Sequence, residues 1–246
     1  MSRQLGDVFE DLSFGPLAGL KEGGEGSGTI PGSAEARLVH LINRALGVLH
    51  SRYLISQKSI QIRCIADRTL YPLVVEHTDS FVDTDNPGSE PEKFIIDTAE
   101  NPYSGDLIAI RQVFGPDKTS VDPAAVKEFM LNDDSSDSTI YVPNFDVLQV
   151  VAPVAGDIYT VLYQARHPLL GIADVSQQIY LPDGLFPALE AWVAAKVFLS
   201  KNGEEHVARG SQLMGQYEQA CLRAEQDNLL VTPQSGNNKL ETRGFK

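Results

Sequence analysis

The feature that most constrains the fold is the stretch of residues 182–228, which has the pattern of two consecutive helices. Only Glu190 and Lys196 carry a charge within residues 186–199, and this apolar composition predicts a helix with contacts on more than one face. The Asn202-Gly203 pair predicts its end, because glycine adopts the left-handed cap conformation without strain. The next helix is predicted from residues spaced three and four positions apart, namely Val207, Gly210, Met214, Tyr217, Cys221 and Ala224. The short turn between the two indicates an antiparallel helical hairpin.

A third helix is predicted over residues 34–54. Ser33 is expected to cap it, with Ala36 instead of Glu at the reciprocal position of the capping box. The predicted apolar face consists of Leu38, Ile42, Ala45, Leu49 and Tyr53. The regular spacing of this face favours a helix that packs one side against a core.

Between these helices the hydrophobic period changes to two, which is typical of half-buried strands. Ile60, Ile62 and Cys64 alternate with polar residues, and the run continues to Ala66. Further strands are predicted at 71–75, 94–97, 106–114, 139–142, 147–151 and 158–166. Residues 123–131 are predicted to form a short helix, with Pro123 at its first position.

This order predicts the α+β class, because strands grouped between helices favour an antiparallel sheet. We expect a helical bundle, made of the N-terminal helix and the C-terminal antiparallel helical hairpin, with a β-rich antiparallel insertion and extended termini. The expected parts are a flexible N-terminal arm (1–32), the bundle (33–54 and 181–229), the insertion (55–180) and an extended C-terminal tail (230–246). The arm is dense in Gly and Ser at 23–32, yet apolar at 12–17. Two interpretations stay open, since the arm could pack on its own domain or dock on another subunit.

Composition narrows the possible classes of protein. A hydrophobic content of 42% is typical of a globular chain, and no apolar run is long enough to predict a membrane span. The formal net charge of −13 disfavours a general nucleic-acid binder, although an acidic wall is compatible with a channel through which DNA passes. Cys64 and Cys221 are expected to be reduced thiols, and the first residues lack the apolar stretch of a secretory signal.

No motif in the sequence predicts catalysis, a cofactor or a metal. The acidic residues Asp133, Asp134 and Asp137 do not have the ligand spacing of an EF-hand loop. The sequence contains neither a Gly-x-Ser-x-Gly elbow nor a phosphate-binding Gly-x-x-x-x-Gly-Lys. None of the histidines forms a close ligand pair in the sequence (His40, His50, His77, His167 and His206). We therefore predict that the protein is not an enzyme.

Several motifs together resemble a known family. The residues at 179–182 (Ile-Tyr-Leu-Pro), 188–194 (Ala-Leu-Glu-Ala-Trp-Val-Ala) and 210–221 resemble the helical hairpin of head-to-tail adaptor proteins of short-tailed bacteriophages. These are also called connector, head completion or tail tubular proteins. Residues 163–168 (Tyr-Gln-Ala-Arg-His-Pro) and 41–46 (Leu-Ile-Asn-Arg-Ala-Leu) are similar to a strand end and an N-terminal helix of that family. The likeness covers roughly residues 34–228.

The resemblance implies a virion structural protein of the phage neck, made in the host bacterial cytoplasm. It implies a homo-oligomeric ring, usually a dodecamer, that binds the portal protein, contacts a tail or nozzle protein and extends the DNA channel. The implied portal-binding residues of the C-terminal tail are Leu230, Val231, Pro233, Leu240, Arg243 and Phe245. The candidate subunit-interface residues are Trp192, Val193, Phe198 and Tyr217.

Two other interpretations of the sequence stay open. A phage tail or baseplate component that binds a fibre or nozzle would suit the long block of strands. A small hydrolase that uses acidic residues of that block is the enzymatic alternative. Trp192 itself could be a plain core residue instead of a subunit contact.

Overall fold

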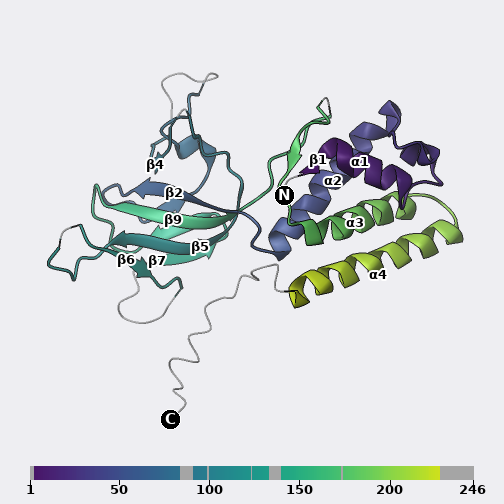
Figure 1. Ribbon diagram of the computed structural model, residues 1–246. Helices are drawn as coiled ribbons and strands as arrows, with labels where there is room; N and C mark the ends of the chain where they lie inside the picture. Colours follow the sequence, from purple (N-terminus) through teal and green to yellow (C-terminus); the bar gives the residue numbers. More distant parts are fainter. Residues whose placement is uncertain are drawn as a thin grey trace, which may run out of the picture. The chain divides into compact units, whose positions relative to one another are not determined.

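The computed structural model describes residues 3–83, 91–98, 100–122, 124–132, 140–172 and 174–227. Within these residues the chain forms four α-helices, three short 3-10 helices and ten strands. Its contacts divide it into two compact units (Figure 1). The helical unit comprises residues 1–55 and 167–246, and the strand unit comprises residues 56–166.

The predicted architecture, a helical bundle with a β-rich insertion and an extended N-terminus, is wrong. The fold is α+β and much of it is β-rich, with three antiparallel sheets. The strand unit has a hydrophobic core of its own, and even the helical unit contains a two-stranded sheet, β1 (Arg3–Gln4) with β10 (Gln178–Ile179). The hydrophobic period of two predicted many of the strands. It does not predict how the strands pair into sheets or which core they enclose.

The helical unit is built around the predicted hairpin. The first helix of the hairpin is α3 (Phe186–Leu199), and it buries residues on all sides. The chain then turns at Gly203, whose φ of 118° favours glycine. The second helix, α4 (Glu204–Gln226), lies alongside α3 in Figure 1. The helical unit also contains two 3-10 turns, η1 (Lys21–Gly26) and η3 (Asp183–Leu185).

The helix predicted over residues 34–54 is α2 (Gly32–Arg52). Its predicted apolar face is buried, and its last member, Tyr53, follows the helix in an extended conformation. The predicted cap is wrong. Pro31 occupies the N-cap position without a side-chain hydrogen bond, so Ser33 lies inside the first turn.

The N-terminal segment, predicted to be irregular, forms α1 (Leu5–Phe14). Leu5, Val8 and Leu12 are fully buried in the core of the helical unit. Ser13 ties the glycine-rich stretch to this helix, because its Oγ donates to the carbonyl of Gly23 at 2.5 Å. Of the two interpretations left open, the structure shows the one in which the segment packs on its own unit.

The strand unit contains two of the antiparallel sheets. One has the strand order β4-β2-β9-β5-β6 and the other has the order β3-β8-β7. The strands are β2 (Gln57–Arg63), β3 (Leu70–Pro72), β4 (Ile95–Ile96), β5 (Leu107–Pro116), β6 (Val126–Phe129), β7 (Ile140–Asn144), β8 (Val147–Val150) and β9 (Ile158–Ala165); η2 (Val75–His77) is a 3-10 turn. Side chains from both sheets meet in one core, where Tyr71 and Phe94 pack edge to face at 5.2 Å.

The helix predicted over residues 123–131 is wrong, because Val126–Phe129 is the edge strand β6. It pairs with β5, where Val113 lies opposite Phe129. This pairing overrides the local helix preference of the sequence. Among the described helices, none has both the length and the apolar composition needed to cross a lipid bilayer.

Candidate functional site

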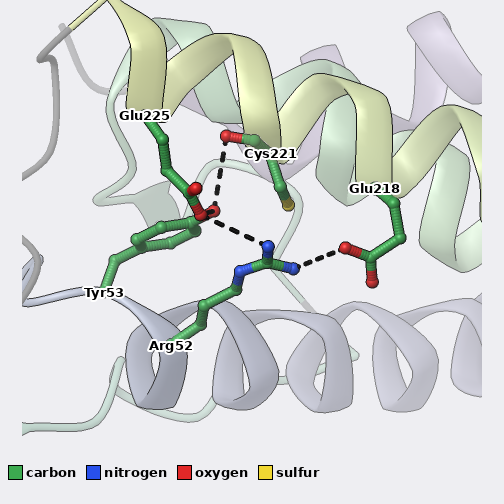
Figure 2. Close-up of polar contacts among 5 residues, drawn as sticks. All are labelled: Arg52, Tyr53, Glu218, Cys221 and Glu225. Carbon is green, nitrogen blue, oxygen red and sulfur yellow. Dashed lines mark hydrogen bonds and ion pairs between the residues drawn. The ribbon is translucent and has the colours of Figure 1, made fainter.

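A polar cluster joins the end of α2 to the last turns of α4. It consists of Arg52, Tyr53, Glu218, Cys221 and Glu225, and we call it the Arg52–Tyr53 cluster (Figure 2). The three α4 residues are spaced by three and four positions, which places them on one face of the helix. Because Tyr53 leaves α2 with extended φ and ψ of −124° and 147°, its ring points toward that face.

The side chains of Arg52 and Tyr53 each contact more than one group on α4. The Arg52 guanidinium donates to the carboxylate of Glu218 at 2.8 Å and to that of Glu225 at 3.3 Å. The Tyr53 hydroxyl lies 2.7 Å from Oε1 of Glu225 and 3.4 Å from the backbone carbonyl of Cys221. Glu225 therefore binds both Arg52 and Tyr53, whereas Glu218 binds Arg52.

Burial makes these contacts unequal. The Glu218 side chain is 55% exposed, whereas the Glu225 and Arg52 side chains are each 31% exposed and Tyr53 is fully buried. Solvent screens the ion pair of Arg52 with Glu218 most strongly, which reduces its contribution relative to the contacts of Glu225. Burial, followed by the hydrogen bond to Glu225, raises the pKa of Tyr53. The hydroxyl therefore stays protonated and remains a donor at neutral pH.

The cluster fastens two elements of the helical unit. Tyr53 keeps its proton, and Cys221 is a free thiol that is fully buried. The cluster lies next to two points on the chain. One is Ile55, the last residue of the helical unit before the chain passes to the strand unit. The other is Asp227, which follows Glu225 by two positions and precedes the predicted C-terminal tail.

Sequence reasoning missed this cluster, because Arg52 and Glu218 are 166 residues apart. The one local signal is the spacing of Glu218 and Glu225, seven positions apart on one helix face. That signal alone names no partner. The pairing depends on how α2 and α4 pack, which the hydrophobic pattern does not specify.

The candidate subunit-interface residues lie inside the helical unit. Trp192, Val193 and Tyr217 are at most 6% exposed and belong to its hydrophobic core. Phe198 is partly buried against the same core, and its ring lies 5.9 Å from that of His206. The structure thus places all four in or against the hydrophobic core of the helical unit.

Other predicted residues fall outside the described part of the chain. These are the implied portal-binding residues Leu230, Val231, Pro233, Leu240, Arg243 and Phe245 and the acidic residues Asp133, Asp134 and Asp137. Their interpretation therefore stays a prediction.

The sequence also did not predict that two histidines meet in the helical unit. The rings of His50 and His167 lie 5.6 Å apart, and both residues are buried. His167 Nε2 accepts a hydrogen bond from the amide of Tyr180 at 3.0 Å, and Nδ1 lies 2.6 Å from the carbonyl of Pro168. Burial lowers the pKa of His167, which favours this neutral, hydrogen-bonded ring.

The described residues contain no group of three or more His, Cys, Asp or Glu side chains that could hold a metal ion. Comparison with known proteins identifies no family, since no family model matches the sequence and no curated protein is significantly similar to it. Function is therefore inferred from the residues of this chain.

Proposed function

We propose that this chain is a structural protein of the phage neck, a head-to-tail adaptor that assembles into a ring under the portal. In this role it extends the DNA channel and gives the tail a surface on which to dock. The proposal starts from the resemblance of the hairpin and strand-end motifs to adaptor proteins. It is a role in assembly, and it requires no reaction chemistry.

The observation that carries the proposal is the Arg52–Tyr53 cluster at the end of α4. Two α2-end side chains bind Glu225, and the predicted portal-binding tail begins at residue 230, five positions further along the chain. A tail that binds a partner gains affinity when its attachment point is rigid, because less freedom is lost on binding. The cluster supplies such a rigid attachment point.

A closed ring needs heterologous contacts, in which one patch meets a different patch on the next subunit. Because Trp192 and Val193 are buried in the helical unit, we propose that exposed apolar residues take that role instead. Val207 and Leu222 on α4 are each 50% exposed. They supply exposed apolar area on α4, although the sequence pattern placed Val207 on the packed face of that helix.

The test of this function is portal attachment by tail variants. We expect that deletion of residues 231–246 leaves a folded protein that no longer joins purified portal rings, measured by co-sedimentation and negative-stain imaging. A sharper variant replaces Leu240, Arg243 and Phe245 by alanine, and we expect the same loss.

The matched control replaces Ser235, Asn237 and Asn238 by alanine in the same tail and should attach normally. Normal attachment of the deletion variant would contradict the docking role of the tail. If the full-length protein forms a stable oligomer that ignores the portal, the tail or baseplate alternative is favoured over the adaptor.

A further inference from the structure

A pocket of about 520 Å³ lies within the strand unit, beside β2 and β4. One wall is formed by four consecutive residues of β2, from Lys58 to Gln61. Another is formed by residues 96–98 and 101–104. Thr160 and Tyr163 on β9 complete the lining. The volume is in the range of sites that hold small organic molecules.

The pocket exists because β4 is short. It pairs with β2 only at Gln61 and Ile62. The amide of Arg63 donates to the carbonyl of Phe94 at 2.8 Å, so the backbone groups of odd-numbered β2 residues point to this edge. By the same alternation, the N–H and C=O of Ser59 point into the space beyond β4, where the described residues give them no partner.

Uncharged polar side chains gather around the same space. Five of these side chains form no hydrogen bond in the described part of the chain. They are Ser59, Gln61, Asn101, Ser104 and Thr160. They come from two strands and one loop and line a single pocket. Together with the backbone of Ser59 they provide several donors and acceptors for one ligand.

The charged groups of the lining are already bound within the protein. Lys58 Nζ lies 2.6 Å from the Asp106 carboxylate. The Asp97 carboxylate accepts bonds from the Ser80 hydroxyl at 2.5 Å and from the Tyr103 amide at 3.0 Å. Although burial opposes the charge on Asp97, these hydrogen bonds lower its pKa and keep it ionised. The pocket therefore presents neutral hydrogen-bonding groups to a ligand.

We propose that this pocket binds a neutral saccharide of one to three sugar units. Sugar hydroxyls both donate and accept, which matches the hydroxyl and amide groups of the lining. An added peptide strand fits less well, because the open edge of β2 spans only residues 57–59 and ordinary strands have about five or six residues. This site is separate from the proposed ring function, and either can fail without the other.

The test is a titration of the full-length, isotope-labelled protein with maltose, cellobiose and N,N′-diacetylchitobiose, followed by amide chemical shifts. We expect at least one sugar to give saturable shifts at Ser59, Asn101 and Thr160. The variants Gln61→Ala and Asn101→Ala should each weaken binding by about tenfold, the effect of one lost hydrogen bond. Both side chains are exposed, so the variants should fold.

Gln149→Ala is the matched control, since Gln149 lies on β8 in the same unit but outside the pocket. It should bind as the wild type does. The proposal is overturned if none of the three sugars gives saturable shifts at the pocket, or if the two pocket variants bind as tightly as the control. Equal or tighter binding of a sulfated disaccharide would also overturn it, because the lining would then select charge.

Discussion

At the scale of single residues, the Tyr53 hydroxyl and the Arg52 guanidinium share one carboxylate, that of Glu225. A hydrogen bond to a charged group contributes more than one between neutral groups, and burial of the Tyr53 ring adds the packing of an aromatic side chain. The Arg52 guanidinium carbon also lies 5.5 Å from the centre of the Tyr53 ring. Each contact therefore helps to hold the last turn of α4.

We expect Tyr53→Phe to lower the free energy of unfolding of the helical unit by about 1–2 kcal/mol, because Glu225 loses its closest donor while the ring stays packed. Urea denaturation followed by circular dichroism measures this change. Tyr180→Phe is the control, since Tyr180 is 59% exposed, and its effect should stay within about 0.5 kcal/mol. An equal loss in both variants would show that the bond to Glu225 contributes nothing specific.

Glu190 is a second residue with a measurable role. Its side chain on α3 is 22% exposed, and Arg3 approaches it only to 4.0 Å while binding Asp11 at 2.8 Å. Burial, and then the negative charge of Asp11, raises the pKa of Glu190 from its ordinary 4.5 to about 7. The ionised form is thus disfavoured in the folded state, and the fold loses stability as the pH rises from 4.5 through 7.

Glu190→Gln should therefore stabilise the protein at pH 8 by about 1–3 kcal/mol. The gain should shrink as the pH falls and disappear near pH 4.5, where wild-type Glu190 is protonated in the folded state. Thermal melts at several pH values measure it, with the exposed Glu10→Gln as control. A gain that is the same at pH 5 and pH 8 would contradict the assignment to this carboxyl.

At the scale of elements, the α3–α4 pair depends on close approach at one glycine. A Cβ built on Gly210 would lie 2.6 Å from Cγ of Leu199 and 3.2 Å from the carbonyl oxygen of Ala195. Real Cβ atoms essentially never come as close as 2.6 Å, so the two helices pack at this distance because residue 210 has no side chain. Gly215, on the same helix, has nothing within 4 Å of such a Cβ.

These two glycines give a matched pair of variants. Gly210→Ala should destabilise the protein by about 1–3 kcal/mol, because the new methyl group pushes the helices apart. Gly215→Ala should stabilise it by about 0.5–1 kcal/mol through helix propensity alone. Thermal or urea unfolding compares them directly. Stabilisation by both substitutions would mean that the α3–α4 contact can adjust without cost.

Elements also show what the sequence could and could not predict. The helices α2 and α4 were predicted because their apolar residues repeat with the helical period, and α3 was predicted because it is apolar on nearly every side. The strand β6 was predicted as a helix, since its pairing with β5 is a tertiary contact that local preference does not contain. The helix α1 was missed because the glycine-rich stretch after it suggested a flexible arm, although Leu5, Val8 and Leu12 have helical spacing.

At the scale of the whole molecule, the chain builds two hydrophobic cores, one in each unit. The sequence predicted strands between helices, but it could not show that the strands close around a core of their own. Sequence analysis also missed the Arg52–Tyr53 cluster and the pocket beside β2, because both depend on tertiary contacts. The Arg52–Tyr53 cluster and the pocket beside β2 each join residues from separate elements, and no local pattern marks such a meeting.

The proposed adaptor role also belongs to this scale. A tail on each subunit of a ring multiplies the strength of attachment, because later tails bind at a high effective concentration. One weak contact per subunit is therefore enough for firm attachment to a ring-shaped partner. A single free subunit should bind the portal only weakly.

The most direct test is the mass of the purified protein alone and after mixing with portal rings, measured by light scattering with negative-stain imaging. The adaptor role predicts a monomer in isolation, near 26.8 kDa, that becomes a ring when the portal is present. A monomer that does not bind the portal, or an oligomer of the same mass with and without it, would contradict that role.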